Sequence, residues 1–271
     1  MIVGDAMSGR FKGRTAVVLG ASAEQGSGGA IAKALRSEDC DVIIAARRAD
    51  VLEAFAEKIG AHALVADARD EAQVARLADA AGARFGDIDI AVNAAGAPVR
   101  SSIACVTPTL LQEALDLNYF AHVYFIKHMA RVMVRNGSII VISSMSGTCV
   151  TDGMVFPYSC AKAATNCLVQ CAAIEYGPMN IRVNAILPGP IESAASRGLF
   201  KNAELRHAFQ KEVPLGRIAQ PEDIADAALW LAGPSFVTGL NLQVNGGMFL
   251  SRFPTPSELP GGAAAYQRRP G

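Results

Sequence analysis

Residues 15 to 35 read TAVVLGASAEQGSGGAIAKAL, which is an apolar run, a glycine-rich loop and a helical pattern in succession. The glycines let the backbone turn tightly and approach a pyrophosphate, and the N-terminus of the following helix favours the negative charge of that group. A cluster of glycines alone is common in ordinary turns. Its position between an apolar strand and a helix near the start of the chain favours a nucleotide site.

The rest of the chain repeats this alternation of strand and helix. Most of the expected strands are continuously apolar, as in strands that helices cover on both faces. The expected strands are 15–19, 41–45, 62–65, 88–92, 138–142, 181–187 and 241–244, and the expected helices are 30–36, 51–59, 71–85, 109–134, 158–176 and 221–231. Such alternation predicts an α/β fold of the Rossmann type, a doubly wound, seven-stranded parallel sheet with helices on both faces.

The composition fits one folded domain. The chain has 271 residues, of which 51% are hydrophobic and 18% charged, so it can bury a large core, and its length permits one or two domains. No linker divides the body, so we expect a single domain over residues 1–252, with 190–214 as a partly helical substrate lid. The tail, 253–271, is rich in Pro, Gly and Ala, and we expect it to be disordered or to contact a neighbouring subunit.

Charge and cysteine usage exclude several classes of partner. The formal net charge is zero, which argues against a general attraction to nucleic acid or to an anionic membrane. No apolar run approaches the roughly 20 residues of a membrane helix, and the N-terminus lacks a signal pattern. We therefore expect a soluble cytoplasmic protein. The six cysteines form no CxxC pair and lack zinc-finger histidines, so no metal site is expected, and the four histidines carry no prediction.

Tyr158 and Lys162 are four positions apart in an expected helix, so both side chains lie on one face. A free tyrosine has a pKa of about 10, and a fixed ammonium beside it favours the phenolate. Such a pair predicts a phenol with a lowered pKa that donates and accepts protons near working pH. Alone, the pair is typical of an ordinary surface contact.

Polar residues follow several of the expected strands, where the carboxyl ends of parallel strands share one edge of the sheet. Asp67 and Ala68 follow the third strand, 93–96 (Asn-Ala-Ala-Gly) follows the fourth, and Ser144 follows the fifth. Taken separately, these residues are typical of turns and caps. Their recurrence at one edge favours a ligand crevice.

In their order along the chain, from about Lys12 to Gly247, these motifs resemble the short-chain dehydrogenase/reductase family. The glycine loop departs from the family pattern, because Leu19 replaces the usual threonine and two extra residues separate Gly20 from Gly26. The extra pair is expected to bulge outward near the adenosine end. Further motifs of the family pattern begin with Pro188 and Gly189 and end at 244–247 (Val-Asn-Gly-Gly).

The resemblance implies four catalytic residues. Tyr158 would transfer a proton to or from the substrate oxygen, and Ser144 would orient that oxygen, with Ser143 and Ser146 as alternatives. Lys162 would lower the tyrosine pKa and hold the nicotinamide ribose. The backbone carbonyl of Asn118 would hold a water that reaches Lys162, although a packing role for this asparagine stays open.

The resemblance also implies a nicotinamide dinucleotide cofactor. Its expected contacts are Gly20, Ser22, Gln25, Gly26, Ser27, Gly28, Arg47, Arg48, Asp67, Ala68, Asn93, Ala94, Ala95, Gly96, Tyr158, Lys162, Pro188, Gly189, Ile191 and Ser193. An acidic residue at the end of the second strand would select NAD, but Ala46 is neutral and two arginines follow it. A guanidinium can hold a phosphate in bidentate fashion, so NADP is favoured, with NAD as the alternative.

The expected partner is a small carbonyl or alcohol substrate, whose identity the sequence does not give. An apolar pocket would favour a hydrophobic one, and its candidate residues, which alternatively pack a lid, are Met145, Val150, Met154, Phe156, Leu199 and Phe200. The small apolar face of 158–176 suits close helix packing, and the resemblance implies that this helix pairs subunits into a homotetramer or homodimer, which light scattering would test. Two other functions stay open, a dinucleotide-binding sensor or scaffold without catalysis, and epimerisation or dehydration on the same scaffold.

Overall fold

The computed structural model describes residues 9–22, 24–133, 136–149, 153–194, 196–252, 254–255 and 258. Its centre is a seven-stranded sheet in the order β3-β2-β1-β4-β5-β6-β7, and every neighbouring pair is parallel. The strands are β1 (Thr15–Leu19), β2 (Asp41–Ala46), β3 (His62–Val65), β4 (Ile90–Asn93), β5 (Ser138–Ile142), β6 (Arg182–Pro188) and β7 (Asn241–Val244). The predicted doubly wound sheet is confirmed, and its order reverses between β1 and β4, where such folds place a ligand crevice.

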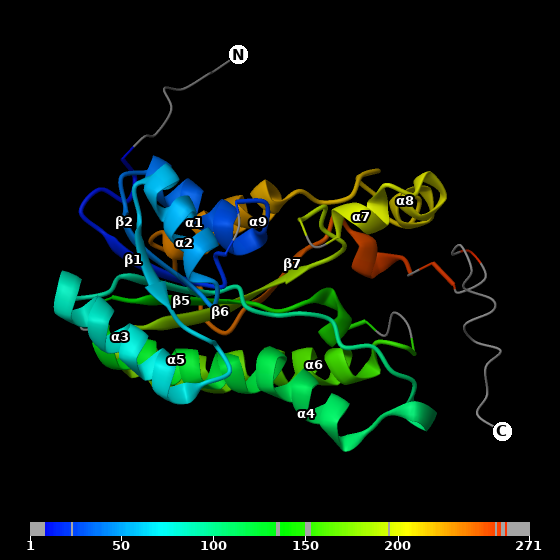
Figure 1. Ribbon diagram of the computed structural model, residues 1–271, viewed down its shortest axis with the longest axis horizontal. Helices are drawn as coiled ribbons and strands as arrows, with labels where there is room; N and C mark the ends of the chain where they lie inside the picture. Colours follow the sequence, from blue (N-terminus) through cyan, green and yellow to red (C-terminus); the bar gives the residue numbers. More distant parts are fainter. Residues whose placement is uncertain are drawn as a thin grey trace, which may run out of the picture.

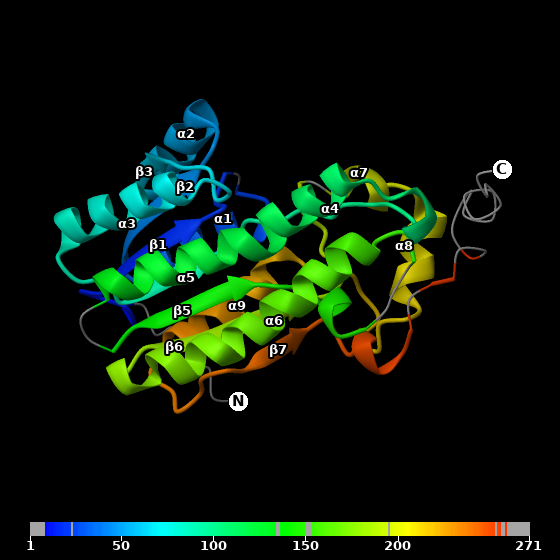
Figure 2. The same cartoon turned by 90° about the horizontal axis from the view of Figure 1, so that it is seen from below.

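Helices cover both faces of the sheet (Figure 1). On one face lie α1 (Ser27–Ser37), α2 (Ala49–Ile59) and α9 (Pro221–Ala232), and on the other lie α3 (Glu71–Phe85), α5 (Ala121–Val132) and α6 (Phe156–Tyr176). Figure 2, seen from below, shows the second set running alongside one another. Each set closes its own apolar core against the sheet, which explains why the central strands are apolar on both sides.

The single helix expected over 109–134 is instead three segments. These are α4 (Pro108–Leu115), a π-helical turn η2 (Asp116–Phe120) and α5, after which Met133 is extended and Val134 lies outside the described residues. The Asn118 side chain donates to the carbonyl oxygen of Ala114, and side chains that bond into the helical ladder accompany such irregular turns. Thr107 begins α4 by accepting a hydrogen bond from the Leu110 amide.

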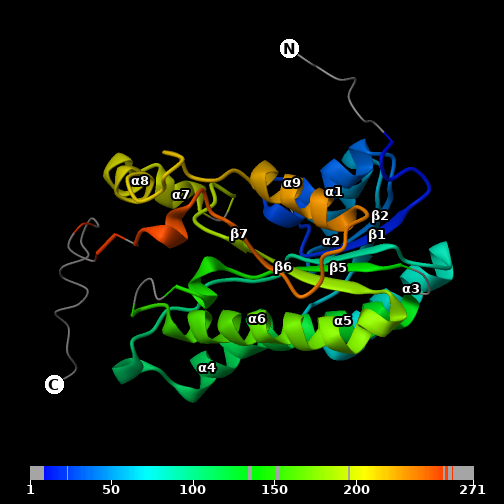
Figure 3. The same cartoon turned by 180° about the vertical axis from the view of Figure 1, so that it is seen from behind.

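The segment expected as a lid contains α7 (Arg197–Phe200) and α8 (Ala203–Gln210). In Figure 3 these helices and α4 flank the same end of the molecule, on opposite sides of it. Of the tail, expected to be disordered or subunit-contacting, only Pro254, Thr255 and Glu258 lie within the described residues. No helix in the described part of the chain is both long and apolar enough to span a bilayer.

Candidate active site

Tyr158 and Ser144 meet at the carboxyl end of the sheet. Tyr158 lies in the first turn of α6, and Ser144 is the second residue after β5. A hydrogen bond joins the two side chains. Ser144 is buried, and its Oγ also accepts a hydrogen bond of 3.1 Å from the amide of Ser146. This pair holds two hydroxyl groups where one substrate oxygen can contact both.

The neighbouring serine points elsewhere. The Ser143 Oγ donates to the Oδ1 of Asn166 at 2.6 Å and lies against α6, where it is buried. The Ser143 hydroxyl therefore helps to hold α6 against the sheet. Of the two serines that directly follow β5, Ser144 is the one that bonds the tyrosine.

Lys162 is almost wholly buried, with only 2% of its surface exposed. Its Nζ donates to the carbonyl oxygen of Ile142 at 2.9 Å and lies 5.7 Å from the centre of the Tyr158 ring. Gly96 leaves the room for this ammonium, because a Cβ there would lie 3.2 Å from Nζ. The helical spacing of four residues thus does bring tyrosine and lysine together.

The pKa values run against the simple expectation for this pair. Burial lowers the pKa of Lys162 to about 7, and no charged group among the described residues contributes to that shift. Burial also raises the pKa of Tyr158, and the hydrogen bond from Ser144 opposes this only in part. The predicted lowering of the tyrosine pKa is therefore wrong for the chain itself. The four-residue spacing predicts that Lys162 lies beside Tyr158, but it does not show that apolar surroundings destabilise the charged forms of both side chains.

Asn118 and His122 lie on the other side of Lys162. The Asn118 side chain bonds the amide and carbonyl of Ala97 at 3.1 and 3.0 Å, and its backbone carbonyl accepts from the Thr165 hydroxyl at 2.5 Å. His122 is wholly buried, and its Nε2 lies 3.5 Å from the Lys162 Nζ. His122 had no role in the expectations from sequence, although a histidine one helical turn after Asn118 in an apolar helix is a signal that could have found it.

The glycine loop fits a pyrophosphate. Gly20 has a φ of +89°, and a Cβ there would lie 2.5 Å from the Ala95 amide nitrogen. Helix α1 begins after Gly26 with no side-chain cap and no acidic residue in its first turn. The first amides of the helix are therefore open to an anion. Ser22, Gln25, Ser27 and Gly28 line the same loop and helix start.

The longer loop has a fixed anchor that the sequence did not reveal. The Glu24 carboxylate forms ion pairs with Lys33 of α1, at 3.2 Å, and with Lys58 of α2. These pairs hold the extra residues toward α1 and α2. Ala23, between Ser22 and Glu24, lies outside the described residues.

The ends of β2 and β3 carry the residues expected near the adenosine. Arg47 and Arg48 directly follow β2 and are exposed. Asp67 pairs with Arg69 at 2.6 Å, and this arginine, with a smaller contribution from Arg47, lowers the pKa of the Asp67 carboxyl. Ala68 is buried. The edge thus presents exposed guanidinium groups around one carboxylate that is already paired.

Asn93 is buried and uses its amide within the protein. Its Nδ2 donates to the carbonyl oxygen of Ala121 at 3.1 Å, and its Oδ1 accepts from the Ala95 amide at 3.0 Å. The amide of Ala94 donates to the Leu19 carbonyl at 2.8 Å. Asn93 therefore shapes the loop from Ala94 to Gly96 rather than presenting its own side chain to a ligand.

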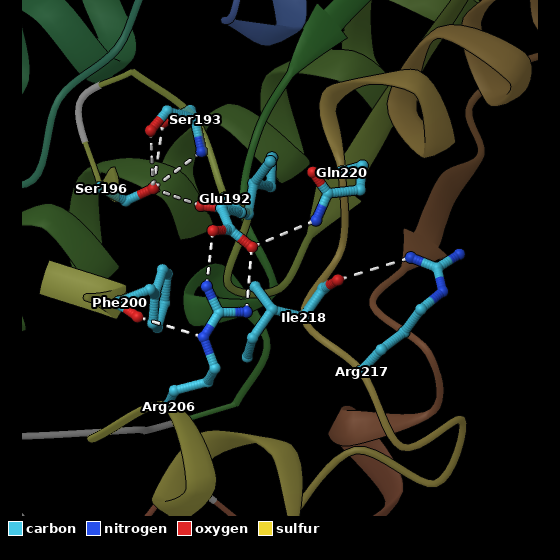
Figure 4. Close-up of polar contacts among 9 residues, drawn as sticks. Glu192, Ser193, Ser196, Phe200, Arg206, Arg217, Ile218 and Gln220 are labelled. Atoms are coloured by element: carbon cyan, nitrogen blue, oxygen red, sulfur yellow. Dashed lines mark hydrogen bonds and ion pairs between the residues drawn. The ribbon is translucent and has the colours of Figure 1, made fainter. Parts of the chain in front are cut away.

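The segment after β6 is held by a network of polar contacts (Figure 4). The Glu192 carboxylate forms a two-pronged ion pair with Arg206 of α8, with distances of 2.5 and 3.0 Å, and accepts from Gln220 at 3.3 Å. The carbonyl of Ile191 accepts a hydrogen bond from the Ser196 hydroxyl, which also contacts Ser193.

Two further contacts fix this segment relative to the rest of the crevice. The amide of Ala194 donates to the carbonyl oxygen of Gln25 at 2.9 Å, which joins the lid segment to the glycine loop. A Cβ at Gly189 would lie 2.9 Å from the Cβ of Asn245, so only glycine fits there. Met145 packs with Val213 and Met248 beside the site as a small apolar wall, and Val150 lies outside the described residues.

Comparisons with known proteins agree with the fold. A family model described as enoyl-(acyl carrier protein) reductase matches residues 20–249. An uncharacterized oxidoreductase of Mycobacterium tuberculosis is 35% identical, over 91% of this chain and 96% of its own length. An L-rhamnose 1-dehydrogenase (NAD(P)(+)) of Azotobacter vinelandii is 33% identical, over 88% and 97% respectively. A solved short-chain type dehydrogenase/reductase from Mycobacterium ulcerans has a TM-score of 0.89 at 30% identity, covering 96% of this chain and 99% of that one.

Proposed function

The chain belongs to the short-chain dehydrogenase/reductase family of oxidoreductases, and from this premise we propose that it transfers hydride between a nicotinamide cofactor and a carbonyl or secondary alcohol carbon. The observation that carries the proposal is the hydrogen-bonded pair of Tyr158 and Ser144, with the Lys162 ammonium on the same helix face. This arrangement supplies a proton donor, a second hydroxyl for orientation and a positive charge within one crevice.

Proton transfer is the task of Tyr158. The bound cofactor would supply or accept the hydride at the substrate carbon. During reduction, the Tyr158 hydroxyl gives its proton to the carbonyl oxygen as that oxygen becomes an alcohol, and during oxidation the phenolate takes the proton back. Ser144 donates a hydrogen bond to the same oxygen and so orients the substrate.

Lys162 stabilises the phenolate that remains when the proton has left. An ammonium near the ring favours the ionised form, and it does so only while it is protonated. Because the pKa of Lys162 is about 7, the ammonium and the neutral amine are both present near neutral pH. In this proposal the same amine would also hold a ribose hydroxyl of the cofactor, and the amides at the start of α1 would hold its phosphates.

The main alternative is a dinucleotide-binding sensor or scaffold. A binder without catalysis has no need of Ser144, Tyr158 and Lys162 together in one contact cluster. A panel of ketones, aldehydes and secondary alcohols, assayed with NADPH and NADH, separates the two. We expect turnover of at least one hydrophobic member of the panel. Tight cofactor binding without turnover of any member would support the sensor.

Exposed Arg47 and Arg48 support NADP as the preferred cofactor, since neither guanidinium is occupied by an ion pair with another described residue and Ala46 adds no acidic group. The relative from Azotobacter vinelandii is named for use of either cofactor, so NAD stays the alternative. A guanidinium that grips the 2′-phosphate would discriminate strongly, because NADH offers a hydroxyl in its place.

Replacing Arg47 with aspartate tests this preference. We expect the Kd for NADPH to rise roughly 10- to 100-fold, because a charge-assisted contact is lost and a repulsive one is created. The Kd for NADH should change little, or fall. Fluorescence titration of both cofactors measures the change, and Arg76→Asp, the same charge change at an exposed position of α3, is the control. Equal changes in the Kd values of the two cofactors would mean that Arg47 is an ordinary surface residue without a role in cofactor choice.

The segment 190–214 is proposed as the substrate lid. Its internal ion pair between Glu192 and Arg206 supports a segment held together as one unit, and its contact with the glycine loop supports a place over the cofactor crevice. The apolar wall around Met145 supports a hydrophobic ketone or alcohol as substrate. Assembly through α6 is retained as a proposal, since its outer face carries exposed Cys160, Cys167 and Cys171 beside the strongly exposed Ile174.

A further inference from the structure

His122 is a buried titratable group next to the catalytic centre to which the proposed mechanism gives no part. Its side chain has no solvent exposure, and its Nε2 lies 3.5 Å from the Lys162 Nζ. Its Nδ1 has no hydrogen-bond partner among the described residues. A buried polar nitrogen without a partner is costly, so the position of this imidazole calls for a compensating contact.

The contact with Lys162 fixes the form of the imidazole. Burial of the ring and, to a smaller extent, the positive charge of the ammonium keep the pKa of His122 well below its usual value, so the ring is neutral. A neutral imidazole has one nitrogen that donates and one that accepts. Because an ammonium only donates, Nε2 is the acceptor, and Nδ1 carries the hydrogen that lacks a partner.

Few other acceptors face this ammonium. The carbonyl oxygen of Ile142 takes one hydrogen bond from Nζ. The backbone carbonyl of Asn118 already accepts from Thr165 at 2.5 Å, and the Asn118 side chain is bonded to Ala97 and Ala114. Among the described residues, His122 therefore provides the acceptor that is not already engaged by another group.

On the basis of the proposed function, we propose that His122 is a positioning residue for Lys162, whose ammonium donates to the imidazole Nε2 and is thereby kept charged and facing Tyr158. The groups that face Lys162 are Tyr158 on α6, His122 on α5, the η2 turn and the end of β5, and no carboxylate is among them. Because no carboxylate competes for the ammonium, the acceptor at His122 Nε2 favours the charged form of Lys162.

The size of the effect follows from the geometry. A separation of 3.5 Å is long for a hydrogen bond, so the contact belongs at the weak end of those made to charged groups. Loss of such a contact lowers the pKa of the lysine by about one unit. The imidazole thus offsets part of the lowering that burial imposes on Lys162.

The direct test measures the pKa of Lys162 by NMR of its labelled side chain, assigned through Lys162→Met, in four proteins. These are the wild type, His122→Leu, which removes the acceptor, His122→Gln, whose amide oxygen can replace Nε2, and the control His128→Leu on the same helix. We expect the pKa to fall by about one unit in the leucine variant, to recover in the glutamine variant and to stay unchanged in the control.

The same pKa in all four proteins would overturn the proposal. The leucine variant removes a nitrogen without a partner, so we expect it to fold, and His122→Phe provides a second variant whose ring has no hydrogen-bonding nitrogen. A purely structural His122 would change the thermal unfolding midpoint without moving the lysine pKa.

Activity measurements keep this inference separate from the proposed function. With a substrate from the panel, the alkaline limb of the pH profile of kcat should move to lower pH by about one unit in His122→Leu and return in His122→Gln. The KM for cofactor should change little. If the wild type turns over nothing, the proposed function fails, but the NMR result still decides the role of His122.

Discussion

Turnover falls by roughly 10²- to 10⁴-fold when Tyr158 is replaced by phenylalanine, because the substrate oxygen then has no proton donor beside it. Phenylalanine fills nearly the same volume, so α6 and the Ser144 loop should keep their positions. The Kd for the cofactor should therefore stay within about threefold of the wild type, which places the loss in the chemical step. Steady-state kinetics and cofactor titration, on the panel substrate that the wild type uses best, measure the two effects.

Tyr176→Phe is the matched control, since the same hydroxyl is removed from the far end of the same helix. We expect it to retain normal turnover. A Tyr158→Phe protein with normal kcat would remove this residue from the mechanism, and equal losses in both variants would point to a general disturbance of α6.

Lys162→Met gives the second large effect, and it appears in stability as well as in turnover. An unfolded lysine has a pKa of about 10.4, whereas burial lowers the pKa of Lys162 to about 7 in the folded chain. Between these values the unfolded state binds more protons, so the free energy of unfolding rises with pH. The full difference is about 5 kcal/mol, and it is present as a penalty on the folded state below pH 7.

The methionine variant lacks this titration. We therefore expect it to be more stable than the wild type near neutral pH, with the advantage shrinking as the pH approaches 10, while its turnover falls by at least about 10²-fold. Urea unfolding of both proteins, without cofactor, at several pH values measures the difference, in which groups common to both cancel. Lys12→Met, at an exposed lysine, should show no such pH dependence. Parallel stability curves for wild type and Lys162→Met would mean that the buried amine keeps its ordinary pKa.

The sheet was predictable because its strands are short, continuously apolar runs, such as Ile139 to Ile142. Such runs are expected only where both faces of a strand are buried. The glycine loop and the pair on α6 were predictable because their spacing is local. The π-helical turn at Asn118 was not, since an apolar pattern continues through it and hides the extra residue in that turn. The sign of the Tyr158 pKa shift was not predictable either, because it depends on how completely the folded chain excludes water from the Tyr158 side chain itself.

Contacts between distant segments were also beyond the sequence. Glu24 lies in the loop that is two residues longer than the family pattern, but its pairing with Lys33 and Lys58 requires knowing that α1 and α2 lie side by side. The sequence did not distinguish His122 from the other three histidines, whereas the fold places its Nε2 3.5 Å from the Lys162 Nζ.

The π-helical turn between α4 and α5 lets these two consecutive helices direct their side chains independently of each other. An α-helix advances about 100° per residue, so the wider turn resets the angular phase of everything that follows it. Helix α4 can therefore aim its side chains at α6 near the crevice, while α5 keeps Phe125 and Met129 directed into the core beneath the sheet. Substitutions on α4 can therefore change the entrance of the crevice without disturbing the packing of α5 in the core.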